Sequence, residues 1–252
     1  MIAAELNCDL GEHEDVAGQQ LENQLLPLVS SVNVACGGHA GSPDRLVEIA
    51  GLCRRCGTAF GAHPSFPDRA GYGRRELQLP PETLLQSLIE QLRLAAAAAH
   101  HAGIPLTHVK PHGALYNLAA DDSGIARLVM AAIRETTPSA SLIALAGSRL
   151  ADWARKSGLV VREEFFVDRG YTADGRLLSR QLPGSLITSP SILGDRVRQW
   201  LENRTVTTTD GHVLTITAET LCIHSDTPGV LENVRHIRRI LDSFHAKTRY
   251  SH

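Results

Sequence analysis

Short apolar runs rich in Val and Ile alternate along this chain with longer segments of helical period. Such alternation is typical of repeated strand–helix units that build a parallel sheet. The candidate strands cover residues 3–9, 31–36, 59–62, 106–110, 142–146, 160–167 and 220–224. Seven such units in 252 residues fit a closed barrel better than an open sheet. We therefore expect an α/β fold, a (β/α) barrel that forms a single domain over residues 1–252.

Local signals also predict helix boundaries and one hairpin. Ser42 is a cap residue at the start of a helix that Gly57 ends. A longer helix is expected over residues 81–101, and the last helix is expected to begin at residues 226–228. Residues 205–217 break the alternation, because two short strands flank an Asp–Gly pair, which is a hairpin signal. This hairpin is expected to decorate the barrel rim.

The charge balance excludes several classes of partner. The 25 Lys and Arg against 27 Asp and Glu leave a net charge of -2, so there is no basic face for nucleic-acid phosphates. No run approaches the roughly 18 apolar residues of a membrane span, and residues 1–5 contain no charged leader before an apolar run. The five cysteines are an odd number and indicate no disulfide framework. We expect a cytoplasmic protein that binds neither nucleic acid nor a membrane.

Polar groups capable of chemistry follow almost every predicted strand. A barrel gathers the carboxyl ends of its strands around one mouth, so these groups are expected to meet in a single site. For any one histidine a structural hydrogen bond is an equal alternative, but the convergence of the whole set favours a site. The candidates at strand ends are Asn7, Asp9, Asn33, His39, His63, Lys110, His112, Glu164, Asp168, Arg169, His224 and Asp226.

Two cationic features have both a functional and a structural interpretation. Lys110 is one of only three lysines, and at a strand end it can bind an anion or polarise a carbonyl. Its structural alternative is a buried ion pair with Asp9 or Asp168. Arg74 and Arg75 lie in a long polar connection, where paired guanidiniums can close over an anionic substrate. A solvated basic loop is the alternative there.

Motifs for metals and nucleotides are weak or absent. Asp9, His39 and His63 have the residue types of a mononuclear metal site, and His112 or His224 could join them. None of them shows tight spacing such as H-x-x-x-H, so the idea rests on barrel geometry alone. The chain has no G-x-S-x-G elbow and no G-x-x-x-x-G-K-[ST] loop. If ATP is used, no P-loop on this chain holds it.

Several of these runs together resemble the LamB/YcsF family, over about residues 4–241. Three departures concern pocket shape and leave every charged motif residue in place. Gly38 replaces an aromatic residue, Ser65 with Phe66 replaces a glycine–aromatic pair, and Ser225 replaces a glycine. The matching motifs are NCDLGE at 7–12, NVACGGHAG at 33–41, GAHP at 61–64, HVKPHGALYN at 108–117, DRGY at 168–171 and CIHSDTP at 222–228.

The resemblance implies ATP-dependent opening of 5-oxo-L-proline to L-glutamate, by a complex of this chain with the B and C subunits of a 5-oxoprolinase. It also implies a deviant, seven-stranded (β/α) barrel similar to that of polysaccharide deacetylases. A five-membered lactam is a resonance-stabilised amide, so hydrolysis needs its carbonyl oxygen converted to a leaving group, for instance by phosphorylation. ATP with magnesium is therefore the expected cofactor.

Residue chemistry suggests a role for each candidate. Asp9, with His63 or His112, is expected to activate water or move protons, and Lys110 with Arg169 to stabilise developing negative charge. We expect Lys110→Met to abolish turnover and to leave the fold intact. The expected substrate-binding residues are Asn7, Asn33, His39, Arg74, Arg75, Asn117, Glu164, Asp168, His224 and Asp226.

We expect no tightly bound metal on this chain. Phosphorylation already supplies the activation that a Lewis acid would give, and Lys110 would oppose a divalent ion in the same pocket. One alternative is a metal-dependent amide hydrolase or deacetylase that uses Asp9, His39 and His63. Another is a non-catalytic substrate-binding subunit.

Overall fold

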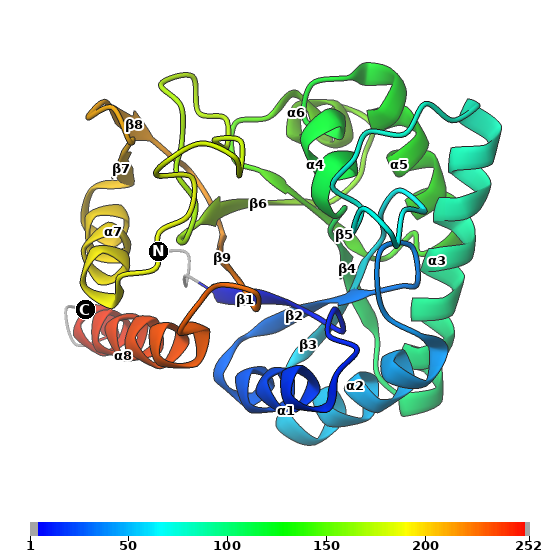
Figure 1. Cartoon of the computed structure of the whole chain (residues 1–252), viewed down its shortest axis with the longest axis horizontal. Coiled ribbons are helices and arrows are strands. Elements are labelled where there is room, and N and C mark those ends of the chain that lie inside the picture. The colour runs from blue at the N-terminus through cyan, green and yellow to red at the C-terminus, as the bar shows by residue number, and fades with distance from the viewer. Residues whose placement is uncertain (1–4, 250–252) are drawn as a thin grey trace.

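Seven parallel strands close into a barrel in the computed structural model, which describes residues 5–249 and their side chains through residue 246 (Figure 1). The expected α/β barrel and its seven strands are therefore confirmed. Residues 3 and 4 of the first predicted strand lie outside the described residues. In barrel order the strands are β1 (Glu5–Leu10), β2 (Ser31–Ala35), β3 (Ala59–His63), β4 (Leu106–Val109), β5 (Ser141–Leu145), β6 (Val161–Phe166) and β9 (Thr220–His224).

Helices pack around the outside of the barrel (Figure 1). Ser42 accepts a hydrogen bond from the Arg45 amide at the start of α2, and Gly57 ends that helix with a left-handed φ of 71°. No described helix is both long enough and apolar enough to cross a membrane. The helices are α1 (Val16–Leu25), the 3-10 turn η1 (Leu26–Leu28), α2 (Pro43–Cys56), α3 (Pro81–Ala102), α4 (Gly113–Ala119), α5 (Ser123–Thr136), α6 (Arg149–Lys156), α7 (Pro190–Asn203) and α8 (Val230–Arg249).

Two short strands form a separate antiparallel pair, β7 (Thr205–Thr207) with β8 (Val213–Thr215). They flank the Asp–Gly pair that predicts a hairpin. The segment packs on α7, where the buried Trp200 donates its indole N–H to the carbonyl of Ile216 at 2.9 Å. The last helix, α8, begins at Val230, two residues after the predicted start.

Alternation along β1 separates the apolar core from a polar barrel interior. Leu6, Cys8 and Leu10 are fully buried in the apolar core, whereas Asn7 and Asp9 belong to the opposite face of the strand. In an enclosed barrel both faces of a strand exclude water, so every residue of β1 after Glu5 is buried. The polar residues of the inner face therefore need hydrogen-bond partners inside the barrel.

A network of buried side chains supplies these partners. Asn33 Nδ2 donates to Asn7 Oδ1 and to Asp9 Oδ1, both at 2.8 Å. Asn7 Nδ2 donates to Thr220 Oγ1 at 2.8 Å, and His108 Nε2 lies 2.9 Å from Asn33 Oδ1. Burial lowers the pKa of His108 to about 3, so this ring is neutral. We expected Asn7 and Asn33 to bind substrate; in the structure Asn33 holds Asp9, and Asn7 holds Asn33, from within the barrel.

Gly61 provides the space for the His108 ring in this interior. A Cβ added at Gly61 would lie 2.1 Å from His108 Nε2, which is closer than any real contact. The pairing of β3 with β4 also shifts register between Phe60 and Gly61. A glycine at this strand position therefore lets the polar layer form beneath the barrel mouth.

Candidate active site

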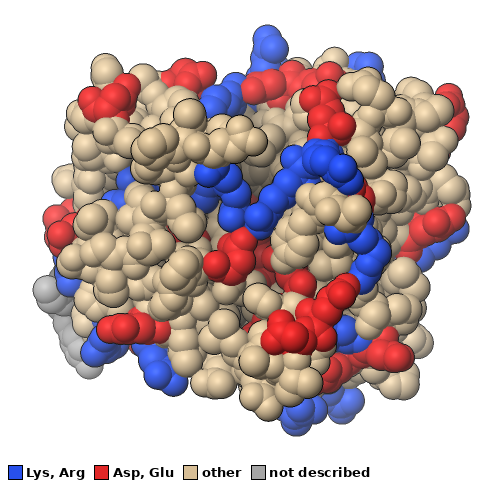
Figure 2. Space-filling model, viewed as in Figure 1, with Lys and Arg blue, Asp and Glu red and all other residues tan. Residues whose placement is uncertain are grey.

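A cavity of about 580 Å³ opens at the carboxyl ends of the barrel strands. The connection between β6 and α7, residues 167–189, forms one of its walls. Lys and Arg side chains gather at a hollow near the middle of the face shown in Figure 2. Of the predicted site residues, the cavity wall contains Asp9, His63, Arg74, Lys110, His112, Asn117, Arg169 and His224.

The remaining predicted residues do not line the cavity, and each of them makes polar contacts within the protein. Arg75 forms an ion pair with Asp68, so it does not join Arg74 as the paired guanidinium that we expected. His39, Glu164, Asp168 and Asp226 each hold another charged or ring-bearing side chain in place. The predicted substrate-binding residues that do not line the cavity are Asn7, Asn33, His39, Arg75, Glu164, Asp168 and Asp226.

Lys110 is buried among acceptors, with an exposed fraction of 1%. Its Nζ lies 3.1 Å from Asp9 Oδ1, 3.1 Å from Glu164 Oε2 and 3.0 Å from Cys222 Sγ. Burial alone would lower the pKa of Lys110, but Asp9, Cys222 and Glu164 outweigh it and raise that pKa well above its usual value. The buried ion pair with Asp9, which was the structural alternative for this lysine, is present, and Glu164 is a second carboxylate partner.

The imidazole rings of His63 and His112 direct the lone pairs of one nitrogen each toward one another. His63 Nδ1 lies 2.7 Å from the carbonyl oxygen of Lys110, and a carbonyl only accepts, so Nδ1 carries the hydrogen. By the same argument His112 Nε2 carries a hydrogen toward the carbonyl of Tyr72, at 3.0 Å. The other two nitrogens, His63 Nε2 and His112 Nδ1, lie 3.0 Å apart. Because two lone pairs repel, a shared proton or a cation must lie between them.

The carboxylate of Glu12 completes this group. Its Oε1 lies 3.2 Å from His112 Nδ1 and 2.9 Å from His39 Nε2, and Tyr72 donates its hydroxyl to Oε2 at 2.9 Å. Burial would raise the pKa of Glu12, but His112 and His39 hold it well below its usual range, so Glu12 is ionised. The His39 ring stacks on His112 with centroids 3.6 Å apart. His39 therefore supports Glu12 and His112 and does not line the cavity.

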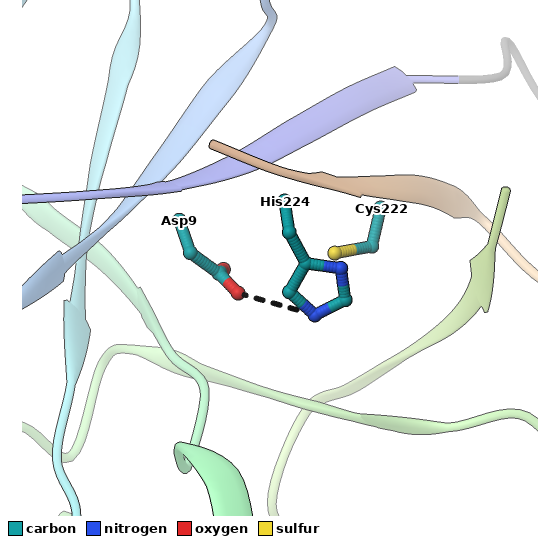
Figure 3. Close-up of side chains that lie close together, drawn as sticks. All are labelled: Asp9, Cys222 and His224. Atoms are coloured by element: carbon teal, nitrogen blue, oxygen red, sulfur yellow. Dashed lines mark ion pairs between the residues drawn. The ribbon is translucent and has the colours of Figure 1, made fainter. Parts of the chain in front are cut away.

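Asp9 lies among donors that keep it ionised. Burial would raise its pKa, but His63 and Lys110 hold it well below the usual range. Its Oδ1 accepts from Asn33 and Lys110, whereas Oδ2 faces His63 Nε2 at 3.4 Å and His224 Nε2 at 3.9 Å. Figure 3 shows the side chains of Asp9 and His224 directed toward each other, with Cys222 beside them.

Asp168 orients His224 from behind. This fully buried carboxylate accepts the backbone N–H of His224 at 3.0 Å, its ring Nδ1 at 3.0 Å, and the hydroxyl of Thr227 at 2.6 Å. Burial would raise the pKa of Asp168, but His224 and Thr227 lower it below its ordinary value. The ring Nε2 of His224 is thereby directed to Asp9 and the cavity, while Asp168 itself is a positioning residue.

Asp168→Asn is expected to lower the free energy of unfolding by about 1.5–3 kcal/mol at neutral pH, because hydrogen bonds to a buried charge are lost. The native pKa lies below the unfolded one, so this stabilisation is complete above about pH 5 and disappears as acid protonates the native carboxyl. Urea unfolding of both proteins at pH 7 and at lower pH measures the difference. A gap between them that widens in acid would contradict the assignment.

The arginines of the cavity wall have two different roles, and Arg169 is the one that anchors a loop. Arg169 lines the cavity, but its Nε donates to the carbonyl of Ser185 at 3.1 Å and its Nη2 to that of Leu178 at 2.6 Å. This side chain, which we expected to stabilise negative charge in the reaction, therefore anchors the wall formed by residues 167–189. The guanidinium of Arg169 is therefore held in one position on the cavity wall.

Arg74 and Arg180 share a single carboxylate. Arg74 Nη2 lies 2.6 Å from Asp226 Oδ2, and Arg180 Nη1 lies 3.0 Å from the same oxygen. Both arginines line the cavity, and the three groups together carry a net positive charge. An incoming anion can therefore bind between two guanidiniums that are already close together. Arg180 comes from the long connection after β6, where sequence alone offered no motif to identify it.

Two of the departures from the family pattern are in contact. A Cβ added at Gly38 would lie 2.4 Å from Ser65 Oγ and 2.4 Å from Gln91 Oε1. An aromatic residue at position 38 therefore requires less volume at position 65. The glycine and serine of this chain fill the same space from the opposite side, next to the His39 and His112 stack.

Comparison with known proteins agrees with the geometry. The model of the LamB/YcsF family matches residues 4–251. The 5-oxoprolinase A subunit of Heliobacterium modesticaldum is 41% identical over 239 residues, which cover 95% of this chain and 94% of the relative. The one from Thermus thermophilus is 40% identical over 241 residues, 96% of each chain. The crystal structure of a lactam utilization protein from the same organism superposes with a TM-score of 0.86, at 39% identity over 95% of this chain and 96% of that one. The chain belongs to the LamB/YcsF family.

Proposed function

We propose that this chain is the A subunit of an ATP-dependent 5-oxoprolinase, which opens the ring of 5-oxo-L-proline to give L-glutamate. The relatives named as 5-oxoprolinase subunits and the lactam utilization protein support a lactam as substrate. The structural observation that carries the proposal is that one cavity combines an arginine pair with a buried cluster of carboxylates and imidazoles. The arginine pair can bind the carboxylate of the substrate, and the carboxylates and imidazoles can catalyse hydrolysis of its amide.

The substrate carboxylate binds between Arg74 and Arg180 in this proposal. The two guanidiniums share only Asp226, so a second carboxylate restores the charge balance. The lactam ring then extends toward the strand ends, where Lys110, His63 and Asp9 line the cavity. Binding by the carboxylate orients the amide relative to these groups, which lowers the entropic part of the barrier.

Ring opening follows activation of the amide by ATP. Transfer of the γ-phosphoryl group to the lactam oxygen gives ADP and a carbon that water can attack. The water oxygen bonds to that carbon, the carbon–nitrogen bond breaks and the nitrogen takes up a proton, which leaves an acyl phosphate. A second water then attacks the acyl phosphate and releases phosphate and glutamate. Asp9, with His63 or His112, receives the proton of the attacking water, and Lys110 stabilises negative charge on the oxygens.

The proposed complex contains two further subunits, B and C, and uses ATP with magnesium. The chain contains no P-loop, so it is not expected to turn over ATP by itself. Its relatives are named as one lettered subunit of 5-oxoprolinase, which supports an assembly of several different chains. All five cysteines are free, which fits the reducing cytoplasm that we propose as its location.

Glutamate release from 5-oxo-L-proline by the reconstituted complex tests this function. We expect glutamate only when all three subunits, ATP and magnesium are present, with one ADP formed for each glutamate. The isolated chain with ATP is expected to give no glutamate above background. ATP-independent release by the isolated chain would instead identify a free-standing amide hydrolase, and an active complex that lacks this chain would leave it no part in the chemistry.

A further inference from the structure

We propose that Glu12, His63 and His112 hold a divalent transition-metal ion, such as Zn²⁺ or Mn²⁺, on the wall of the cavity. All three residues line the cavity, and their ligand atoms converge. The inference concerns metal binding by the isolated chain, and its test does not require the proposed reaction. With an ion bound, His63 and His112 are ligands, and Asp9 alone would receive the proton in the proposed reaction. The sequence alone favours no tightly bound metal, and the arrangement of lone pairs and charges is the reason to propose the opposite.

The separations of the three ligand atoms fit a tetrahedral ion. His63 Nε2 lies 3.0 Å from His112 Nδ1, His112 Nδ1 lies 3.2 Å from Glu12 Oε1, and His63 Nε2 lies 3.8 Å from that oxygen. Zinc binds nitrogen and oxygen at about 2.0–2.1 Å, which places neighbouring ligands of a tetrahedron roughly 3.3 Å apart. A small cation between the three atoms therefore needs only sub-ångström adjustment.

The hydrogen bonds of the ligands are those of a metal site. Each imidazole donates its other N–H to a backbone carbonyl, His63 to that of Lys110 and His112 to that of Tyr72. This contact fixes the tautomer and leaves the lone pair directed at the ion. Glu12 is held by two donors, His39 Nε2 and the Tyr72 hydroxyl. All three ligands are thus oriented before any ion binds.

Charge balance also favours a divalent ion. The buried cluster contains three carboxylates, those of Asp9, Glu12 and Glu164, and one ammonium, that of Lys110, which pairs with Asp9 and Glu164. Its formal charge is therefore -2 when its imidazoles are neutral. Buried charge is costly without compensation. The ammonium is already paired with two carboxylates, so it opposes a nearby cation less than the sequence alone suggests. One proton shared between the two imidazoles would neutralise only one of these two negative charges.

A second group of potential ligands is already occupied by a cation. Asp9, Cys222 and His224 also lie close together (Figure 3). The ammonium of Lys110, however, lies 3.0 Å from Cys222 Sγ and 3.1 Å from Asp9 Oδ1. The metal is therefore assigned to the group with Glu12.

A metal at Glu12, His63 and His112 has a defined consequence for the cavity. Three protein ligands leave a tetrahedral ion one open position for water or a carbonyl oxygen. The two imidazoles are then neutral ligands and cannot take up a proton. Asp9 Oδ2, at 3.4 Å from His63 Nε2, becomes the group that accepts a proton beside the ion.

Equilibrium dialysis of the chelator-treated, purified chain against Zn²⁺ tests this site. We expect the wild-type chain to bind one ion. Tyr72→Phe removes a donor to Glu12 and is expected to weaken binding by about 10- to 100-fold, and Glu12→Gln and His112→Gln by at least as much. Circular dichroism checks that each variant is folded. If the ligand variants do not fold, Tyr72→Phe carries the test.

Two matched controls locate the ion. Cys222→Ser changes the neighbouring group, and His100→Gln removes an exposed imidazole from α3, so both are expected to bind Zn²⁺ like the wild type. With Co²⁺ the near-ultraviolet spectrum is expected to show no thiolate charge-transfer band. The proposal is overturned if the wild-type chain binds no stoichiometric ion, which leaves a shared proton between the imidazoles. It is equally overturned if Cys222→Ser loses the ion and Glu12→Gln retains it.

Discussion

Lys110→Met is expected to lower the free energy of unfolding by about 3–5 kcal/mol, because removal of one partner leaves buried charge uncompensated. The Lys110 ammonium is 1% exposed and lies between the carboxylates of Asp9 and Glu164. Methionine fills a similar volume but leaves these two carboxylates facing each other in the barrel. From the sequence alone we expected Lys110→Met to leave the fold intact. Because Lys110 is buried between two carboxylates, we now expect this variant to be markedly less stable.

The same substitution is expected to reduce glutamate formation by the reconstituted complex. Loss of one charge-stabilising donor costs about 10²- to 10³-fold in turnover. The double variant Lys110→Met, Glu164→Gln removes one of the two uncompensated carboxylates, so it is expected to recover stability without recovering turnover. Urea unfolding and the glutamate assay separate the two effects.

Lys156→Met serves as the matched control, because this lysine is exposed on α6. It is expected to behave as the wild type in both measurements. Near-normal stability of Lys110→Met would contradict the buried ion pairs. Near-normal turnover of a folded Lys110→Met chain would remove Lys110 from the proposed chemistry.

The barrel could be predicted from the sequence because the hydrophobic pattern of its strands differs clearly from that of its helices. Apolar runs of strand length recur between segments of helical period, and residues 220–224 form the strand as predicted. Ser42 and Gly57 mark the ends of α2, because a cap side chain and a left-handed glycine act locally. Local signals of this kind do not depend on distant contacts.

The site could be predicted only at the level of strand ends. A barrel necessarily brings its carboxyl ends together, so Asp9, His63 and Lys110 meet at the cavity as that rule requires. The rule does not say which polar groups are already paired inside the protein. Asn7 lies on the same face of β1 as Asp9, but the amides of Asn7 and Asn33 form hydrogen bonds within the barrel interior.

Contacts that long loops make with site residues could not be predicted from the sequence. Glu12 belongs to the same strand-end run as Asp9, yet its role depends on Tyr72, which is sixty residues away in the chain. Arg180 reaches Arg74 through Asp226 from a connection with no regular structure. Such pairings depend on how loops fold over the barrel, and one sequence contains no periodic signal for them.

Asp9→Asn in the reconstituted complex tests most directly whether the cavity of this chain opens the lactam. Asparagine keeps the shape and an oxygen that can accept from Asn33 and Lys110, and Glu164 still pairs with the ammonium. Only the negative charge and the proton-accepting oxygen facing His63 are lost. The account predicts that glutamate formation from 5-oxo-L-proline falls by about 10²- to 10⁴-fold while the complex still assembles. Turnover within a few-fold of the wild type, by a fully assembled complex, would contradict it.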